Sequence, residues 1–427
     1  MAGMAAIGRP LARDAATLAA GQILVRVVGL LATLYLTRAL GPSDFGALSL
    51  GLAVAVVFSA CAGLGFDDLV VREIARATPA SAHLLGDAFA LRLLALPAAG
   101  LGALGLTLTH PEHGALYPAL LVYGFLYSYL LLICSVLRGR RRMGRQSLLL
   151  AVQVLLAGGG SVLAAHATGD ATLVAIAYPL ATAVSLGLGQ ALLRREGVRP
   201  AWRWRPSVWR SQLGAALPFG ATMIGFLLYD RLALLCVAAV DGQAATGWFG
   251  AAHNLILVLT NLPAIVMLAA FPGLARAARA EPTTVGPTAA GLARLAVVVG
   301  LVAAAALYLL APTIVGLLFG PDYEPSIGVL RTLALGVPAF FLSIVLATVL
   351  EAIDRQRTCA LAVGGTLLLA APGVLAATWL WGYRGGAAAY LAAHLLLAGA
   401  LAYALWRALA PPAGEPARPA LATGAAE

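Results

Sequence analysis

The sequence predicts an all-α integral membrane protein with twelve transmembrane helices. Twelve apolar stretches of about 20 residues run through the chain, a length that spans the ~30 Å hydrocarbon core of a bilayer as a helix. Of the 427 residues, 61% are hydrophobic and 11% are charged, whereas a soluble domain has about 25% charged residues. Because a backbone in lipid must satisfy its own hydrogen bonds, these stretches are expected to be helices.

The helices follow in order, separated by short polar gaps. They are expected over residues 17–37, 45–66, 86–108, 116–137, 147–167, 171–193, 213–237, 246–269, 290–311, 328–350, 359–380 and 386–407. Gly41-Pro42-Ser43-Asp44 and Ala167-Thr168-Gly169-Asp170 are expected to be tight turns between antiparallel helices. The first stretch has no small-residue cleavage site of a signal peptide, so it is expected to remain as a helix.

The arginines predict the orientation. All 28 cationic residues are Arg, and 22 of them lie in alternate gaps and at the two ends of the chain. The other gaps hold only Arg38, Arg331 and Arg384. Cytoplasmic loops carry the excess of positive charge, so both termini are expected in the cytoplasm. Because the arginines are spread over many loops, the net charge of +10 favours contact with anionic membrane lipids and not with nucleic acid.

The longest arginine-rich gap divides the chain into two groups of six helices. We expect an N-terminal lobe over 1–193, a basic linker over 194–212, a C-terminal lobe over 213–410 and a disordered tail over 411–427. Trp202, Trp204 and Trp209 alternate with arginines in the linker, which favours an amphipathic segment at headgroup level.

A short repeat links the two lobes. Phe45-Gly46-Ala47 and Phe249-Gly250-Ala251 each lie near the start of the second helix of their lobe. Weak internal symmetry of this kind is typical of transporters built from repeats.

Ionisable residues inside the first and third helices are candidate functional residues, since a charge at mid-bilayer costs ~2.5–3.5 kcal/mol. Arg26 lies a third to halfway into its helix, where it needs an aqueous cavity or a bound anion; snorkelling to the surface is the alternative. Arg92 lies nearer a helix end, where snorkelling is favoured over a cavity contact.

Two further groups lie in the seventh and eighth helices. Asp230 and Arg231 are adjacent and point about 100° apart, so we expect them not to pair well with each other. They form either a structural ion pair with another helix or a cavity site, with Asp230 binding a proton or cation and Arg231 contacting an anion. His253 and Asn254 are interpreted either as interhelical hydrogen-bonding groups or as contacts to a substrate hydroxyl or a proton.

Signatures of enzymes do not occur in the sequence, which has no HExxH, P-loop or GxSxG motif. His110 and His113 would make a poor metal site, because two ligands in an exposed turn are too few. The four cysteines have no CxxC spacing and are expected to be small buried hydrophobes. We therefore predict no catalytic residues, no cofactor and no bound metal.

Several segments together resemble the polysaccharide and oligosaccharide flippases of the multidrug/oligosaccharidyl-lipid/polysaccharide exporter superfamily. In order along the chain these are residues 38–46 (Arg-Ala-Leu-Gly-Pro-Ser-Asp-Phe-Gly), 63–66, 70–75, 229–231, 246–252, 317–323 (Leu-Leu-Phe-Gly-Pro-Asp-Tyr) and 382–388. The chain departs from the family in having no Lys, and some branches have fourteen helices.

The resemblance implies a flippase in the bacterial inner membrane, with two lobes around a central cavity that opens alternately to each side. Its substrate would be a polyprenyl-diphosphate-linked oligosaccharide for surface polysaccharide, such as O-antigen lipopolysaccharide or exopolysaccharide. Arg26 and Arg231 would contact the diphosphate or acidic sugars, and Arg92, His253 and Asn254 would also line the cavity.

The same resemblance leaves the energy source and the partners open. Asp230 is the candidate site for a coupling ion, H⁺ or Na⁺, with the membrane potential and downhill flow as alternatives. A polysaccharide polymerase and glycosyltransferases are possible partners in the same membrane.

Three alternative functions remain open. A cation-coupled drug antiporter of the same fold would be expected to have a more acidic cavity. A membrane glycosyltransferase or polymerase would need a large outer loop, and no gap is long enough. A peptidoglycan-precursor flippase has the same physical requirements as the oligosaccharide flippase.

Overall fold

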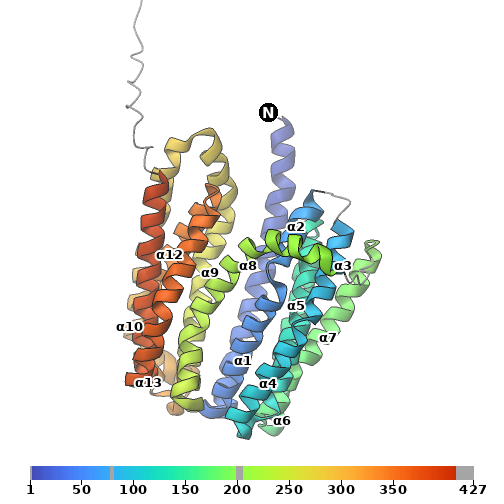
Figure 1. Cartoon of the computed structure of the whole chain (residues 1–427). Coiled ribbons are helices and arrows are strands. Elements are labelled where there is room, and N and C mark those ends of the chain that lie inside the picture. The colour runs from blue at the N-terminus through green and yellow to red at the C-terminus, as the bar shows by residue number, and fades with distance from the viewer. Residues whose placement is uncertain (1, 77–80, 199–204, 410–427) are drawn as a thin grey trace, which may run out of the picture.

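The computed structural model describes residues 2–76, 81–198 and 205–409, and the described chain is helical without strands (Figure 1). The α-helices are α1 (Ala2–Gly63), α2 (Phe66–Ala75), α3 (Ser81–Leu93), α4 (Leu96–Thr109), α5 (Leu116–Gly139), α6 (Met143–Thr168), α7 (Ala171–Arg195), α8 (Pro206–Val240), α9 (Gly242–Ala280), α10 (Pro282–Leu318), α11 (Ser326–Ala334), α12 (Val337–Ala352) and α13 (Gln356–Leu409). Two 3₁₀ turns, η1 (Pro111–His113) and η2 (Pro321–Tyr323), complete the elements. The expected tail and the part of the linker with Trp202 and Trp204 lie outside the described residues.

The protein is a multi-pass membrane protein. Within the described ranges, nine helices are long and apolar enough to cross a membrane, or ten if the bent pair α11 and α12 counts as one span. Two of the nine each contain two expected helices: α1 is interrupted by Gly41 (φ 74°), and α13 by Trp381 and Gly382 (φ 59°). Figure 1 shows α1 running to one end of the bundle and turning back, and Gly41 is the non-helical residue within this helix. The first two expected helices thus lie within α1 and the last two within α13.

Two expected helices are broken in the structure. The third, expected over 86–108, consists of the end of α3 and α4, and the tenth, over 328–350, consists of α11 and α12 with a bend of 45°. Each second piece has a proline in its first turn, Pro97 or Pro338. Proline cannot donate a backbone hydrogen bond and its ring clashes with the preceding turn, which accounts for both breaks.

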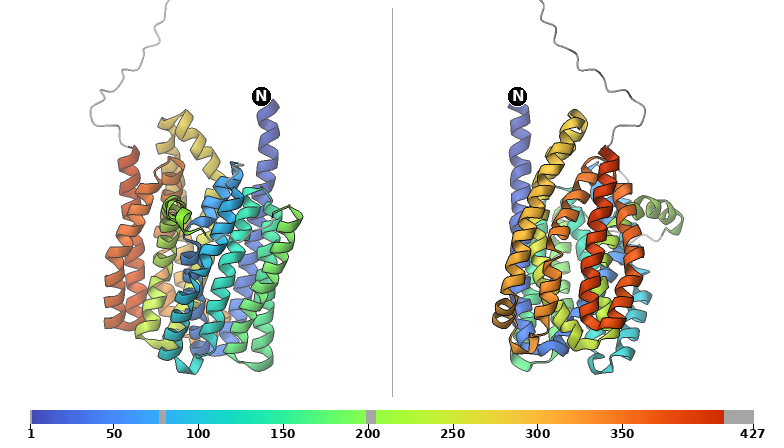
Figure 2. Two further views of the ribbon diagram at one scale, coloured as in Figure 1. Left: turned by 45° about the vertical axis from the view of Figure 1, so that its right-hand side comes forward. Right: turned by 90° about the vertical axis from the view of Figure 1, so that its left-hand side faces the viewer.

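The helices form two groups, which we call the N-terminal lobe (α1–α7) and the C-terminal lobe (α8–α13). Figure 2 shows that the chain start and the end of α13 lie on the same side of the bundle. We call the opposite side, where the chain turns at Gly41, the Gly41 face. The boundaries of the lobes stay a prediction.

The lobes are in close contact at the Gly41 face. A Cβ atom on Gly46 would lie 1.9 Å from the carbonyl oxygen of Gln243, and one on Gly247 would lie 2.0 Å from that of Pro42. Only glycine permits backbones to approach this closely. The side chain of Gln243 also donates a hydrogen bond of 2.8 Å to the Tyr117 hydroxyl across the lobes.

On the other side of the bundle, Arg205 and the first turns of α8 are attached to the N-terminal lobe. Figure 1 shows the first turns of α8 running obliquely past α2 and α3. The fully buried carboxylate of Asp87 in α3 accepts hydrogen bonds from Arg205 (2.7 Å) and Gln212 (2.9 Å). Trp209 is buried in the N-terminal lobe, so it does not face the headgroups as expected.

Candidate functional site

A cavity of about 490 Å³ lies between the lobes and extends into the N-terminal lobe. Helices α1, α5, α6 and α7 line it on one side, and α8 and α9 on the other. Arg26, Arg231, His253 and Asn254, four of the predicted substrate-binding residues, all line this cavity. A volume of this size is within the range of ~300–1,000 Å³ that is typical of small-molecule sites.

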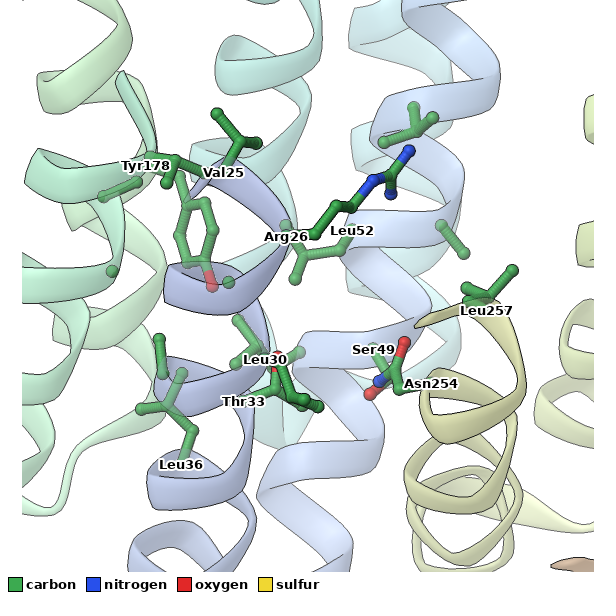
Figure 3. A pocket seen from close by; sticks show the side chains of 18 of the residues that line it. Val25, Arg26, Leu30, Thr33, Leu36, Ser49, Leu52, Tyr178, Asn254 and Leu257 are labelled. Carbon is green, nitrogen blue, oxygen red and sulfur yellow. The ribbon is translucent and has the colours of Figure 1, made fainter. Parts of the chain in front are cut away.

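Arg26 is an exposed cation in the part of the cavity wall that the N-terminal lobe forms. Figure 3 shows its guanidinium extending from the first half of α1 toward the second half, near Leu52. Among the described residues, no carboxylate pairs with Arg26, and no Asp or Glu lines the cavity. The lining therefore carries net positive charge, which in a low-dielectric surrounding favours an anion.

Arg231 supplies the second cation, from the C-terminal lobe. Its Nε lies 3.3 Å from Oδ2 of Asp230, although it lacks a hydrogen bond of good geometry. The two neighbours thus form an ion pair, which was not expected, but they form it without a hydrogen bond, in line with the expectation that they would not pair well. The second expectation, a partner on another helix, is met by Asp230, whose other oxygen faces α9 and α13.

Asp230 belongs to a buried cluster of hydrogen-bonding groups. Its Oδ1 accepts a hydrogen bond from the hydroxyl of Tyr390 (3.2 Å) and lies 3.3 Å from Nε2 of His253. Nε2 of His253 is also 3.0 Å from the Tyr390 hydroxyl, and Nδ1 of His394 is 2.9 Å from the Tyr390 carbonyl oxygen. Because carboxylate and carbonyl oxygens only accept, the hydrogens of neutral His253 and His394 belong on Nε2 and Nδ1, respectively.

Sequence reasoning missed Tyr390 and His394. Their spacing of four residues places them on one face of α13, and this was the available signal. The site residue His253 has its remaining ring nitrogen, Nδ1, buried without a hydrogen-bond partner. His253 therefore has one ring nitrogen that remains available for a further hydrogen bond.

Arg92 lies elsewhere, and the structure places it in neither of its two expected environments. Its side chain is 1% exposed, so it does not reach the surface, and it is not part of the cavity lining. Its Nη2 donates a hydrogen bond of 2.8 Å to Asp67, and Nη1 donates to the carbonyl of Ala88 (3.3 Å). Burial raises the pKa of Asp67, while the guanidinium of Arg92 lowers it by a smaller amount. Arg92 thus packs α3 against α2.

The part of the cavity inside the N-terminal lobe is aromatic. Tyr123 and Tyr127 from α5 and Tyr178 from α7 line it together with Gln153 from α6. The ring centroids of Tyr123 and Tyr127 are 5.4 Å apart, and those of Tyr123 and Tyr178 are 5.5 Å apart. Sequence reasoning missed these tyrosines, whose signal was a spacing of four residues on α5.

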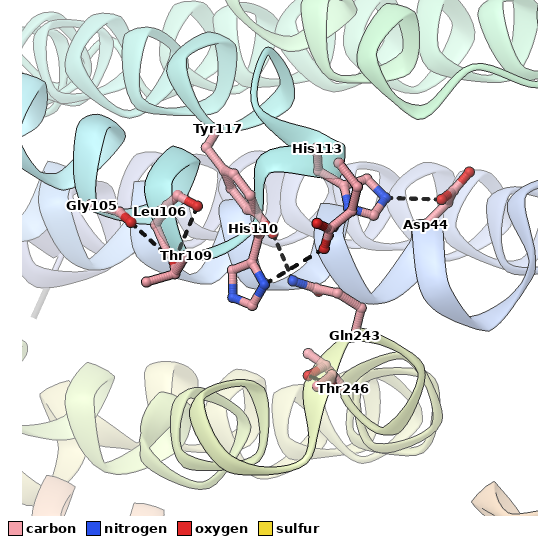
Figure 4. A network of polar contacts seen from close by, with 11 residues as sticks. Asp44, Gly105, Leu106, Thr109, His110, His113, Tyr117, Gln243 and Thr246 are labelled. Atoms are coloured by element: carbon pink, nitrogen blue, oxygen red, sulfur yellow. Dashed lines mark hydrogen bonds and ion pairs between the residues drawn. The ribbon is translucent and has the colours of Figure 1, made fainter.

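The histidines of the short turn at the Gly41 face are engaged in polar contacts (Figure 4). Nε2 of His113 lies 2.9 Å from Oδ1 of Asp44, and His110 lies near Glu112 (3.8 Å). Across the residues that the structure describes, no three His, Cys, Asp or Glu side chains are grouped to hold a metal ion.

Comparison with known proteins identifies related sequences and folds. A family model described as polysaccharide biosynthesis protein matches residues 11–278. The search of curated proteins finds no match.

Solved structures show the same fold at low sequence identity. A structure of the lipid II flippase MurJ in an inward closed conformation has a TM-score of 0.75 at 13% identity, covering 91% of this chain and 87% of that one. An inward-facing multidrug resistance MATE family transporter of the MOP superfamily has a TM-score of 0.70 at 15% identity, covering 90% and 95%. An outward-facing MATE structure has a TM-score of 0.64 at 15% identity, covering 94% and 96%.

Proposed function

The chain belongs to the polysaccharide biosynthesis protein family, and we propose that it is a flippase for a polyprenyl-diphosphate-linked oligosaccharide. In this proposal the substrate moves from the cytoplasmic to the outer leaflet, by alternating access, for the synthesis of a cell-surface polysaccharide. The structures that share its fold are a lipid II flippase and multidrug transporters, which supports a role in membrane transport and not in catalysis.

One observation carries the proposal: Arg26 and Arg231, from opposite lobes, line the same intramembrane cavity, and no carboxylate lines it among the described residues. A diphosphate cannot cross hydrocarbon unaided, because each desolvated charge costs many kcal/mol. Guanidinium groups replace the lost hydration with charge-assisted, bidentate hydrogen bonds. The polyprenyl tail can remain in lipid between helices while the headgroup occupies the cavity.

We also propose an orientation in which both termini are cytoplasmic and the Gly41 face is on the outer side of a bacterial inner membrane. The uneven distribution of arginines between alternate gaps supports this orientation. Glycosyltransferases that build the lipid-linked substrate and a polymerase that consumes it would then be its neighbours in the membrane.

Reconstituted flipping tests the proposal. Proteoliposomes would contain a fluorescent, short-chain polyprenyl-diphosphate oligosaccharide, and quenching by an impermeant reductant would report its outer-leaflet fraction. Arg26→Ala and Arg231→Ala should each slow flipping about 10- to 100-fold, the loss of one charge-assisted hydrogen bond worth ~1.5–3 kcal/mol. Arg384→Ala, an exposed arginine outside the cavity, is the matched control and should flip normally. Normal flipping by Arg231→Ala would contradict the proposal.

The same vesicles distinguish the alternatives. A peptidoglycan-precursor flippase would move lipid II faster than the oligosaccharide substrate, and the fold shared with a lipid II flippase makes this the first comparison. A drug antiporter would extrude a cationic dye. The positively charged cavity lining disfavours cationic substrates, so we expect no dye transport.

We propose Asp230 as the coupling site for H⁺ or Na⁺. It is the intramembrane carboxylate next to a cavity arginine, and the imidazole of His253 lies 3.3 Å from it. Flipping should be accelerated by a pH gradient if the ion is H⁺, and by a Na⁺ gradient at constant pH if it is Na⁺. Asp230→Asn should abolish the acceleration while leaving substrate binding in place. An acceleration that persists in Asp230→Asn would exclude this carboxylate.

A further inference from the structure

The contacts proposed for the diphosphate, with Arg26 and Arg231, do not involve the aromatic part of the cavity. Tyr123, Tyr127 and Tyr178, with Gln153, form a wall that we call the tyrosine wall. Tyr127 is near the middle of the 24-residue α5, and Gln153 is near the middle of α6. Tyr123 is 7% exposed and Gln153 is 5% exposed, so both face the protein interior.

Neither of the usual roles of membrane tyrosines explains the tyrosine wall. Tyrosines of the aromatic belt lie at the membrane interfaces and face lipid, whereas these line a cavity, and Tyr127 lies near the middle of its helix. Packing alone would be served by phenylalanine, because a buried hydroxyl costs ~1–3 kcal/mol when it lacks a hydrogen bond. The Tyr178 hydroxyl has a partner in the Ser161 side chain, whereas the hydroxyls of Tyr123 and Tyr127 and the Gln153 amide line the cavity and are suited to a polar ligand with apolar faces.

A sugar ring has this combination of properties. Its hydroxyls need donors and acceptors, and its C–H faces pack against aromatic rings, which combine an apolar body with a polar end. A diphosphate alone offers no apolar face, and a polyprenyl tail offers no hydrogen-bonding group. Of the three parts of the proposed substrate, the sugar alone matches the tyrosine wall.

The position of the wall fits the order of groups in such a substrate. Arg26 and Tyr127 line the same cavity, so its cationic and aromatic parts are continuous. Figure 3 shows Tyr178 on the N-terminal side, with its hydroxyl directed toward the first half of α1, which carries Arg26. A sugar bonded to a diphosphate at Arg26 would therefore reach the wall directly.

We propose that the tyrosine wall binds the first sugar of the glycan, the one bonded to the diphosphate, and so determines which glycan is accepted. This inference rests on the proposed function and identifies the part of the cavity that recognises the sugar. The cavity of about 490 Å³ holds a headgroup of small-molecule size, which agrees with recognition of the proximal sugar instead of a long polymer.

Two probes that differ by one sugar test this proposal: farnesyl diphosphate and its N-acetylglucosaminyl derivative. Binding to the full-length protein in nanodiscs would be measured by calorimetry. The wild type should bind the glycosylated probe more tightly, and a Tyr123→Phe/Tyr127→Phe/Tyr178→Phe variant should lose part of that preference. Tyr127→Leu, which removes a ring, should lose about tenfold in affinity for the glycosylated probe alone.

The controls separate this proposal from the proposed function. Arg231→Ala should weaken both probes equally, and Tyr403→Phe, on a tyrosine that is 58% exposed in α13, should change neither. If the wild type prefers the glycosylated probe and the tyrosine variants keep that preference, the tyrosine wall is not the sugar subsite, while the flippase function stands. If the wild type binds neither probe, the proposed function fails and the subsite with it.

Discussion

The glycine contact at the Gly41 face allows a quantitative prediction about alternating access. The carbonyl oxygen of Pro42 is 2.0 Å from where a Cβ on Gly247 would stand, against at least 3.4 Å for an ordinary contact, so Gly247→Ala must separate the lobes by about 1.4 Å. Overpacking of this kind typically costs about 1–3 kcal/mol. The cost applies only to the state closed at this face, so the equilibrium should shift about 5- to 150-fold toward the state open there.

Spin labels at Ser43 and Val240, both exposed at this face, would report the separation by double electron–electron resonance. Cys61 would be replaced by Ser, because it is exposed and not buried as expected. Gly247→Ala should increase the population of long distances. Gly273→Ala is the matched control, since a Cβ at this other glycine of α9 meets no atom within 4 Å. A distance distribution identical to that of the wild type would refute the reasoning that closure depends on this contact.

Three further substitutions test the contacts of Arg92 and of Gln243. Asp67→Leu should destabilise the fold by roughly 3–5 kcal/mol, because Arg92 cannot lose its proton and would be buried without a charged partner. Arg92→Met should cost less, since Asp67, whose pKa burial already raises, can take up a proton; its cost should grow as the pH rises through the folded-state pKa. Thermal unfolding in detergent measures both, and equal costs would contradict the argument. Tyr117→Phe removes the hydroxyl that accepts a hydrogen bond from Gln243, so it should destabilise the state closed at the Gly41 face by ~1–3 kcal/mol and increase the population of long spin-label distances, as Gly247→Ala does. An unchanged distance distribution would rule out a role for this hydrogen bond in closure.

The sequence was sufficient to predict the all-α membrane fold, because hydrophobic length and the cost of unsatisfied backbone in lipid leave no alternative to helices. The high cost of an intramembrane charge also pointed to Arg26 and Arg231, which line the cavity. The same argument failed for Arg92, because the ion pair with Asp67 joins two segments whose proximity depends on the fold.

Other residues of the site could not be found from the free-energy cost of placing a charge inside the membrane. Tyrosine is tolerated in many membrane positions, so Tyr127 and Tyr390 carry little signal by themselves. Their significance comes from what lies next to them in space: two further tyrosines in one case, and Asp230 in the other. Which face of a helix meets which neighbour is a property of the packing, and the hydropathy pattern of one chain does not contain it.

The contact between Arg231 and Asp230 bears on how a tightly held anion can be released. An arginine that binds a diphosphate in a low-dielectric cavity would be left as an uncompensated charge when the substrate departs, at a cost of several kcal/mol. Here Oδ2 of Asp230 is 3.3 Å from Nε of Arg231, so the carboxylate can replace the departing phosphate as the counter-charge. Substrate release then exchanges one anion for another, which keeps the free-energy difference between loaded and empty states small. A carrier needs this property, since binding that is favourable enough for loading must remain weak enough for unloading.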